Sequence, residues 1–156
     1  MRIVVGSDHA GFALKEPIVR ALKEWGHQVE DIGGYTAAVD FPDIAQRLCA
    51  AILAGRAERG VMVCGTGIGA CMAANKVPGI RAALCHDVHS AHQCVEHDHA
   101  NVCCLGAQIV GEWLARDLLK TYLDAQPSTE EHFLRRLAKL AEMERGSSEF
   151  EVRGSE

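Results

Sequence analysis

The sequence predicts a three-layer α/β/α fold around a five-stranded, parallel, Rossmann-like sheet. Two observations predict it: short apolar runs alternate with helical patterns along the chain, and glycine-rich polar segments follow most of those runs. Such alternation is typical of a parallel sheet covered by helices on both faces. The 156 residues suffice for one domain with a proper core, so we expect a single domain over residues 1–145. The polar residues 146–156 are expected to form a disordered tail.

The first half of the chain provides three of the expected strands, at residues 2–6, 29–32 and 61–64. A helix is expected between the first two strands, at 12–25, because four apolar residues share one stripe: Leu14, Ile18, Leu22 and Trp25. Gly26, just past this stripe, is a typical helix end. A second helix is expected to begin at Phe41 and to end at about residue 53, before Gly55.

The second half continues the same alternation. A helix is expected from Ala70 to just before Pro78, and apolar runs predict strands at 81–85 and 101–105. Helical patterns at 86–96 and 111–123 follow these strands. The amphipathic pattern at about 129–145 predicts a C-terminal helix that completes the domain.

Composition and charge narrow the class of protein. Apolar residues make up 48% of the chain and charged residues 24%, as in globular proteins. The net charge of -5 argues against a nucleic-acid-binding surface. Met1 and Arg2 lead directly into the first strand without a signal peptide, and no apolar run reaches the roughly 20 residues of a membrane helix. We therefore expect a cytoplasmic protein with no nucleic-acid or membrane partner.

The cysteines are expected to be reduced. There are seven, an odd number, and several lie in apolar runs such as residues 102–105. Without an export signal they are best explained as buried, small hydrophobic side chains. Cys64 is the exception, because a glycine-rich loop follows it.

In open parallel sheets, ligands bind outside the carboxyl ends of the strands. Those ends carry the polar segments of this sequence, at 6–9, 64–67, 85–87 and 105–106. A binding site is therefore expected at this edge of the sheet.

The loop after the third strand reads Gly65-Thr66-Gly67-Ile68-Gly69-Ala70. Its glycines allow a ligand close to the backbone, although they also suit a simple tight turn. The loose dinucleotide-binding pattern is satisfied, with Asp87 at a suitable distance, but the loop lies in the middle of the chain. A nucleoside-triphosphate loop is excluded because no Gly-Lys-Ser/Thr follows.

A third interpretation places a thiolate beside donors for an oxyanion. An ordinary thiol is only about 3% thiolate at pH 7, and the positive potential at a helix start lowers such a pKa. A thiolate next to a group of N–H donors suits proton abstraction beside a carbonyl, because the enediolate charge falls on those donors.

Residues 63–69 and 73–76 resemble the signature of the type B ribose-5-phosphate isomerases, a family that includes the galactose-6-phosphate isomerase subunits. Three further segments agree, at 6–12, 79–82 and 97–102, and the similarity covers about residues 1–140 without large insertions. The resemblance implies an aldose–ketose isomerase that works through a cis-enediolate, without metal or organic cofactor. It further implies a homodimer or homotetramer with sites at the subunit interface and a sugar phosphate as the small-molecule partner.

The resemblance also implies roles for individual residues. Cys64 matches the catalytic base, because Ala70 occupies the position where other members carry a glutamate. Thr66 would assist proton movement, and His97 matches the acid that opens the sugar ring. The N–H groups of Gly65, Gly67 and Gly69 would hold the enediolate. Further substrate contacts would come from Asp8, His9, Ile68 and Asp98, the last at a position often filled by asparagine.

The phosphate-binding arginines of the family are only partly present. Gln108 stands at one such position and His132 at another, whereas Arg136 matches the third. Ribose 5-phosphate is the expected substrate. Galactose 6-phosphate, a tetrose phosphate, an unphosphorylated sugar and a non-catalytic sugar-binding role remain alternatives.

Six metal-ligating side chains lie within fourteen residues: His86, His89, His92, Cys94, His97 and His99. They match no established zinc-binding spacing, and a polar helix face near the site explains them equally well. We therefore expect no functional metal.

Overall fold

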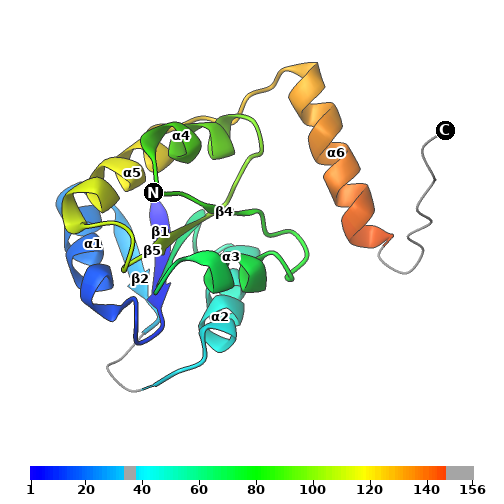
Figure 1. Cartoon of the computed structure of the whole chain (residues 1–156). Helices are drawn as coiled ribbons and strands as arrows, with labels where there is room; N and C mark the ends of the chain where they lie inside the picture. Colours follow the sequence, from blue (N-terminus) through cyan, green and yellow to red (C-terminus); the bar gives the residue numbers. More distant parts are fainter. Residues whose placement is uncertain (34–37, 147–156) are drawn as a thin grey trace.

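The computed structural model describes residues 1–33 and 38–146 and contains the predicted α/β/α sandwich (Figure 1). Its five strands are all parallel, in the order β2-β1-β3-β5-β4. They span Arg2–Ser7 (β1), Gln28–Asp31 (β2), Arg59–Cys64 (β3), Ala82–Leu84 (β4) and Val102–Gly106 (β5). The predicted fold class and all five predicted strands are therefore confirmed.

Six helices connect and flank the strands. They span Phe12–Glu24 (α1), Phe41–Leu53 (α2), Ile68–Ala74 (α3), Val88–Glu96 (α4), Glu112–Asp124 (α5) and Glu131–Arg145 (α6). The prediction placed the start of α4 two residues too early. Asp87 is the N-cap residue, and its carboxylate accepts the Ser90 N–H at 2.7 Å. The predicted disordered tail falls largely on residues 147–156, which lie outside the described residues.

Two apolar layers enclose the sheet. Alternate residues of β3 point to opposite faces, so Val61 and Val63 join the layer formed with α1, α4 and α5. Met62 and Cys64 join the layer formed with α2 and α3. The central strands β3 and β5 are buried along their whole length, which fixes their carboxyl ends relative to one another.

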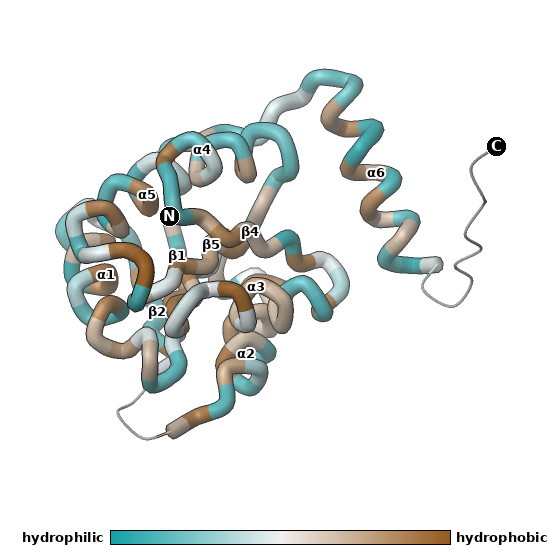
Figure 2. Tube along the Cα trace, viewed as in Figure 1, coloured by the Kyte–Doolittle hydropathy of each residue, from teal (hydrophilic) through white to brown (hydrophobic). Residues whose placement is uncertain are grey.

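The last helix stands apart from the sandwich (Figure 1). A cavity separates it from the sheet edge near β4, lined among others by Leu140, Glu144, Arg81 and Asp98. Figure 2 shows apolar and polar segments alternating along α6, and Leu134, Leu140 and Met143 are exposed on it. Within the described ranges, no helix is long and apolar enough to cross a membrane.

Arg59, at the start of β3, anchors the end of α5. Its side chain is buried, donates to the carbonyl of Tyr122 and, at 2.8 Å, to that of Ala125, and lies over the Tyr122 ring. These carbonyls are among those that a helix leaves without an internal partner at its C-terminus. The guanidinium therefore fixes the point where the chain leaves α5 toward α6.

We expect Arg59→Met to lower the free energy of unfolding by about 2–4 kcal/mol, because it removes charge-assisted hydrogen bonds from buried carbonyls. Arg56→Met is the matched control, since Arg56 forms an exposed ion pair with Glu30 at 3.2 Å and should contribute less than about 1 kcal/mol. Urea denaturation measures both. Equal losses in the two variants would contradict the anchoring role of Arg59.

Candidate active site

The carboxyl ends of β1, β3 and β5 bring the predicted polar segments together. In the sheet register Ser7 pairs with Val63, and Cys64 pairs with Gly106. Asp8 therefore lies beside the end of β3, and the loop that begins at Gly65 lies beside the turn that follows β5. The structure therefore brings these segments together at one edge of the sheet, where the binding site is expected.

Cys64 ends β3 with a buried side chain, and the Gly67 N–H donates to its sulfur at 3.1 Å. Gly67 adopts a left-handed conformation, with φ 79°. A Cβ atom there would lie 2.5 Å from a Leu84 methyl carbon, so this position needs glycine both for its conformation and for space.

The N–H groups that follow are differently engaged. The Ile68 N–H points at the Thr66 hydroxyl, 3.4 Å away. Those of Gly69 and Ala70 find no acceptor in the part of the chain that the structure describes. The Phe41 ring covers Gly69, where a Cβ atom would lie 2.9 Å from the ring. These two N–H groups at the start of α3 are therefore unpaired among the described residues.

The turn after β5 packs against this loop. The N–H groups of Ala107 and Gln108 donate to the carbonyls of Cys64 and Gly65, each at 2.9 Å. The Gln108 amide oxygen lies 3.2 Å from where a Gly65 Cβ would be. Gln108 thus presents a neutral hydrogen-bonding group directly beside the end of β3.

Asp8 is buried and lies on the β1 side of Cys64, opposite the turn that follows β5. One carboxylate oxygen accepts the Gly11 N–H at 2.9 Å, and the Asp8 N–H donates to the Val63 carbonyl at 3.3 Å. A Cβ atom on Gly11 would lie only 2.2 Å from that carbonyl oxygen, so the turn presses directly against β3. His9 and Thr66 are both exposed, so they border the site on its solvent side.

His86 lies at this edge, as expected for the polar segment 85–87, although no role in the site was predicted for it. The Gly106 N–H donates to its Nε2 atom at 3.2 Å, which requires this nitrogen to be unprotonated. A Cβ atom on Gly106 would in turn meet the Thr66 backbone at 2.6 Å. In the sequence, His86 directly follows a predicted strand, and this position indicated its place at the edge of the sheet.

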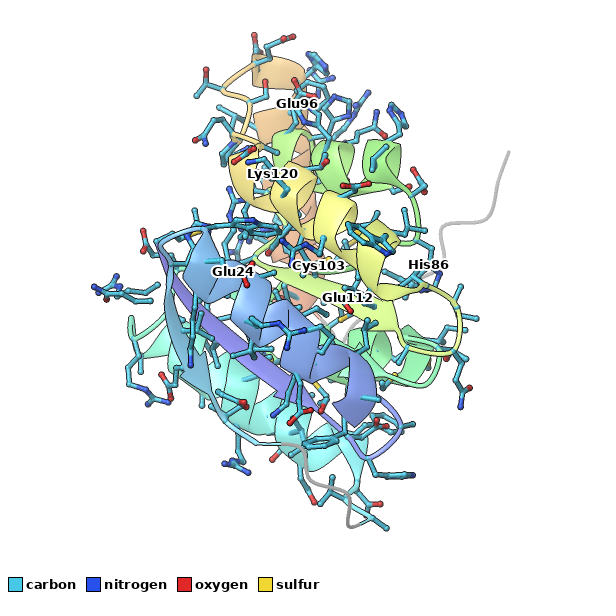
Figure 3. All side chains as sticks on the ribbon, turned by 90° about the vertical axis from the view of Figure 1, so that its left-hand side faces the viewer. Glu24, His86, Glu96, Cys103, Glu112 and Lys120 are labelled. Carbon is cyan, nitrogen blue, oxygen red and sulfur yellow. The ribbon has the colours of Figure 1, made fainter. Side chains whose placement is uncertain are left out.

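The remaining predicted residues, His97, Asp98, His132 and Arg136, form a second group at the other edge of the sheet. Helix α4 starts near the carboxyl ends of the strands and runs back for about 13 Å over its nine residues. Figure 3 shows His86 and Glu96 at its opposite ends. His97 follows Glu96 directly, so within one chain it does not reach Cys64.

This second group gathers around Phe133. The His97 ring stacks on the Phe133 ring with centroids 4.0 Å apart, and the His132 ring lies 3.9 Å away on a tilt. The Arg136 guanidinium lies 5.8 Å from the same ring centroid. Asp98 is exposed on the adjoining turn.

The histidines of the cluster do not converge on one point. His92 and His97 both approach the Glu96 carboxylate, at 3.3 and 3.6 Å, and His99 bonds the Ser128 carbonyl at 2.9 Å. Over residues 1–33 and 38–146, no three His, Cys, Asp or Glu side chains converge as a metal site would require.

The other thiols differ strongly in environment. Hydrogen bonds lower the pKa of the half-buried Cys71 to about 7, the largest from the Cys104 thiol and another from the Asn75 amide. Burial raises the pKa of Cys49 to about 11. Each of the seven cysteines is free in the structure, as predicted.

Residues 3–140 match the family model described as Ribose/Galactose Isomerase. The chain belongs to this family. Ribose-5-phosphate isomerase B of Escherichia coli is 39% identical over 80% of this chain and 85% of its own length. The D-erythrulose-4-phosphate isomerase of Pectobacterium atrosepticum is 41% identical over 81% of this chain and 84% of its own length.

The fold agrees with that assignment. The structure of Clostridium thermocellum ribose-5-phosphate isomerase B matches with a TM-score of 0.91 and 40% identity, covering 94% of this chain and 99% of that one. The ribose/galactose isomerases are sugar-phosphate aldose–ketose isomerases, and the family resemblance predicted from the motifs is confirmed.

We expect Cys71 to be the first thiol alkylated when Cys64 is replaced. In Cys64→Ala, the iodoacetamide reaction of the peptide that contains Cys71 should accelerate as pH rises through about 7, because its lowered pKa makes the thiolate available above that pH. The Cys49 peptide is the internal control and should stay unmodified below pH 9. Mass spectrometry of the digested protein measures both; equal rates would contradict the assignment.

Proposed function

We propose that this family member interconverts ribose 5-phosphate and ribulose 5-phosphate through a cis-enediolate. Cys64 is the base and His97 the acid that opens the sugar ring. The observation that carries the proposal is the sulfur of Cys64 at the end of β3, with the Gly67 N–H directed at it and the Gly69 and Ala70 N–H groups left for an anion.

The Cys64 thiolate removes the proton from C2 of the open-chain aldose, and the electron pair forms the C1–C2 double bond of the enediolate. Negative charge then develops on the carbonyl oxygen, next to the loop donors. The Thr66 hydroxyl carries a proton between the two substrate oxygens, and the Cys64 thiol returns its proton to C1. The proton that leaves C2 thus reaches C1, and the thiolate is regenerated.

A homodimer completes the site in this proposal. His97, Asp98, His132 and Arg136 lie at the opposite edge of the sheet from Cys64, so they serve the Cys64 of a second copy. Two features support it: α4 carries His97 about 13 Å away from the strand ends, and α6 stands apart from the sheet, although Glu144 accepts the Gly79 N–H at 3.1 Å (Figure 1).

A tetrose phosphate is the second candidate substrate. Gln108 replaces a charged phosphate partner with a neutral amide held beside Gly65, and one relative is named for erythrulose 4-phosphate. The two substrates differ in chemistry. Ribose 5-phosphate closes a ring through its free 4-hydroxyl group, whereas the corresponding oxygen of erythrose 4-phosphate carries the phosphate, so this sugar stays open.

We expect Cys64→Ala to abolish isomerisation, with kcat/KM lowered at least about 10³-fold, because it removes the base. The assay compares ribose 5-phosphate, erythrose 4-phosphate, galactose 6-phosphate and unphosphorylated ribose. Cys49→Ala, a buried thiol on α2, is the control and should retain turnover. Full activity in Cys64→Ala would overturn the role of Cys64, and preference for free ribose would overturn the phosphorylated substrate.

We expect His97→Ala to lower kcat/KM for ribose 5-phosphate by about 10²–10⁴-fold, the usual contribution of a positioned acid. Turnover of open-chain erythrose 4-phosphate should fall less than about tenfold, because no ring has to open. His92→Ala is the matched control, since His92 contacts the same Glu96 carboxylate. Equal losses on both sugars would show that His97 does not act in ring opening.

A further inference from the structure

Phe133 lies at the centre of the second group of site residues. Phe133 is 8% exposed, and it is the one buried residue of α6, which spans Glu131–Arg145. Three residues implicated in the proposed site lie around its ring: His97, His132 and Arg136. Sequence analysis gave Phe133 no role.

The contact with His97 restricts the imidazole. The two rings are nearly parallel, 19° apart, with centroids separated by 4.0 Å. The Glu96 carboxylate lies 3.6 Å from the Nε2 atom of His97. One face of the imidazole is thus covered by Phe133 and one edge is met by Glu96, so few orientations of the ring keep both contacts.

The backbone around this stack is itself held in place. The Ser128 N–H donates to the Glu96 carbonyl at 2.8 Å, and the Ser128 carbonyl bonds the His99 Nε2 atom at 2.9 Å. His99 adopts a left-handed conformation, with φ 50°, and is the one non-glycine residue with positive φ in the described chain. Two residues beyond Ser128, α6 begins at its N-cap Glu130. The turn that carries His97 and the start of α6 are therefore joined as one unit.

We propose that Phe133 is a positioning residue that sets the orientation of His97 for ring opening. This inference rests on the proposed function. Phe133 touches no reacting atom in this account; it acts through the imidazole that stacks on it.

Two variants test this role. Phe133→Leu keeps an apolar side chain but removes the stack, whereas Phe133→Tyr keeps the ring. We expect Phe133→Leu to lower kcat for ribose 5-phosphate by about ten- to a hundredfold, the effect of misplacing a catalytic group by about 1 Å. Its kcat for erythrose 4-phosphate should change less than about threefold, and Phe133→Tyr should restore the wild-type ratio of the two rates.

A double variant and a matched control separate positioning from general damage. In a His97→Ala background, Phe133→Leu should cause no further loss with ribose 5-phosphate, because its effect passes through His97. Trp25→Leu is the control: Trp25 is a partly buried aromatic residue on the sandwich core, with the Arg116 guanidinium 5.5 Å from its ring. It should leave the ratio of the two rates unchanged.

A spectroscopic readout is independent of turnover. The imidazole C–H resonances of His97 should be shifted upfield by the Phe133 ring current in the full-length protein, remain so in Phe133→Tyr and lose the shift in Phe133→Leu. A shift that survives in Phe133→Leu would overturn the proposal, as would a Phe133→Leu variant that slows both sugars equally. If the wild-type protein isomerises neither sugar, the proposed function fails. Loss of the ring-current shift in Phe133→Leu would in that case still support the positioning of His97 by Phe133.

Discussion

The loops that follow β3 and β5 meet at backbone contact distance, and the geometry of the site depends on that approach. A Cβ atom on Gly106 would lie 2.6 Å from the Thr66 backbone, and one on Gly67 would lie 2.5 Å from a Leu84 methyl carbon and 3.0 Å from the Leu105 backbone. Two hydrogen bonds join the loops, from the N–H groups of Ala107 and Gln108 to the carbonyls of Cys64 and Gly65. The backbone of Cys64, Gly67 and Gln108 is therefore held in place by contacts between the two loops.

The chain divides its site residues between the two edges of one sheet. The edge with Cys64 provides its sulfur, backbone N–H donors and a buried carboxylate from Asp8. The other edge provides imidazoles and a guanidinium around Phe133. Because a rigid parallel sheet separates the two groups, their cooperation in one reaction requires two copies of the chain in the proposed mechanism.

The fold and the first group of site residues were predictable because they follow from local pattern. Apolar runs located each strand, and parallel strands place their carboxyl ends, with Cys64 among them, at one edge. The separation of His97 from Cys64 follows from the same topology, since a helix after one strand returns to the amino end of the next. The start of α4 was misplaced because Asp87 caps it through a side-chain contact. The place of Phe133 and the low pKa of Cys71 depend on residues distant in sequence, which no local pattern reports.

The turn and helix that are joined at Ser128 form a unit separate from the loop that carries Cys64. The Arg81 side chain donates to the carbonyls of Asp98 and His99, at 3.0 and 2.9 Å. The unit is therefore attached to the sheet edge through its backbone, and this attachment does not depend on which side chains it carries outward. Substitutions at positions 132 and 136 can therefore accumulate without disturbing the loop that carries Cys64. In the proposed mechanism, one unit therefore contacts the phosphate end of the sugar and the other performs proton transfer.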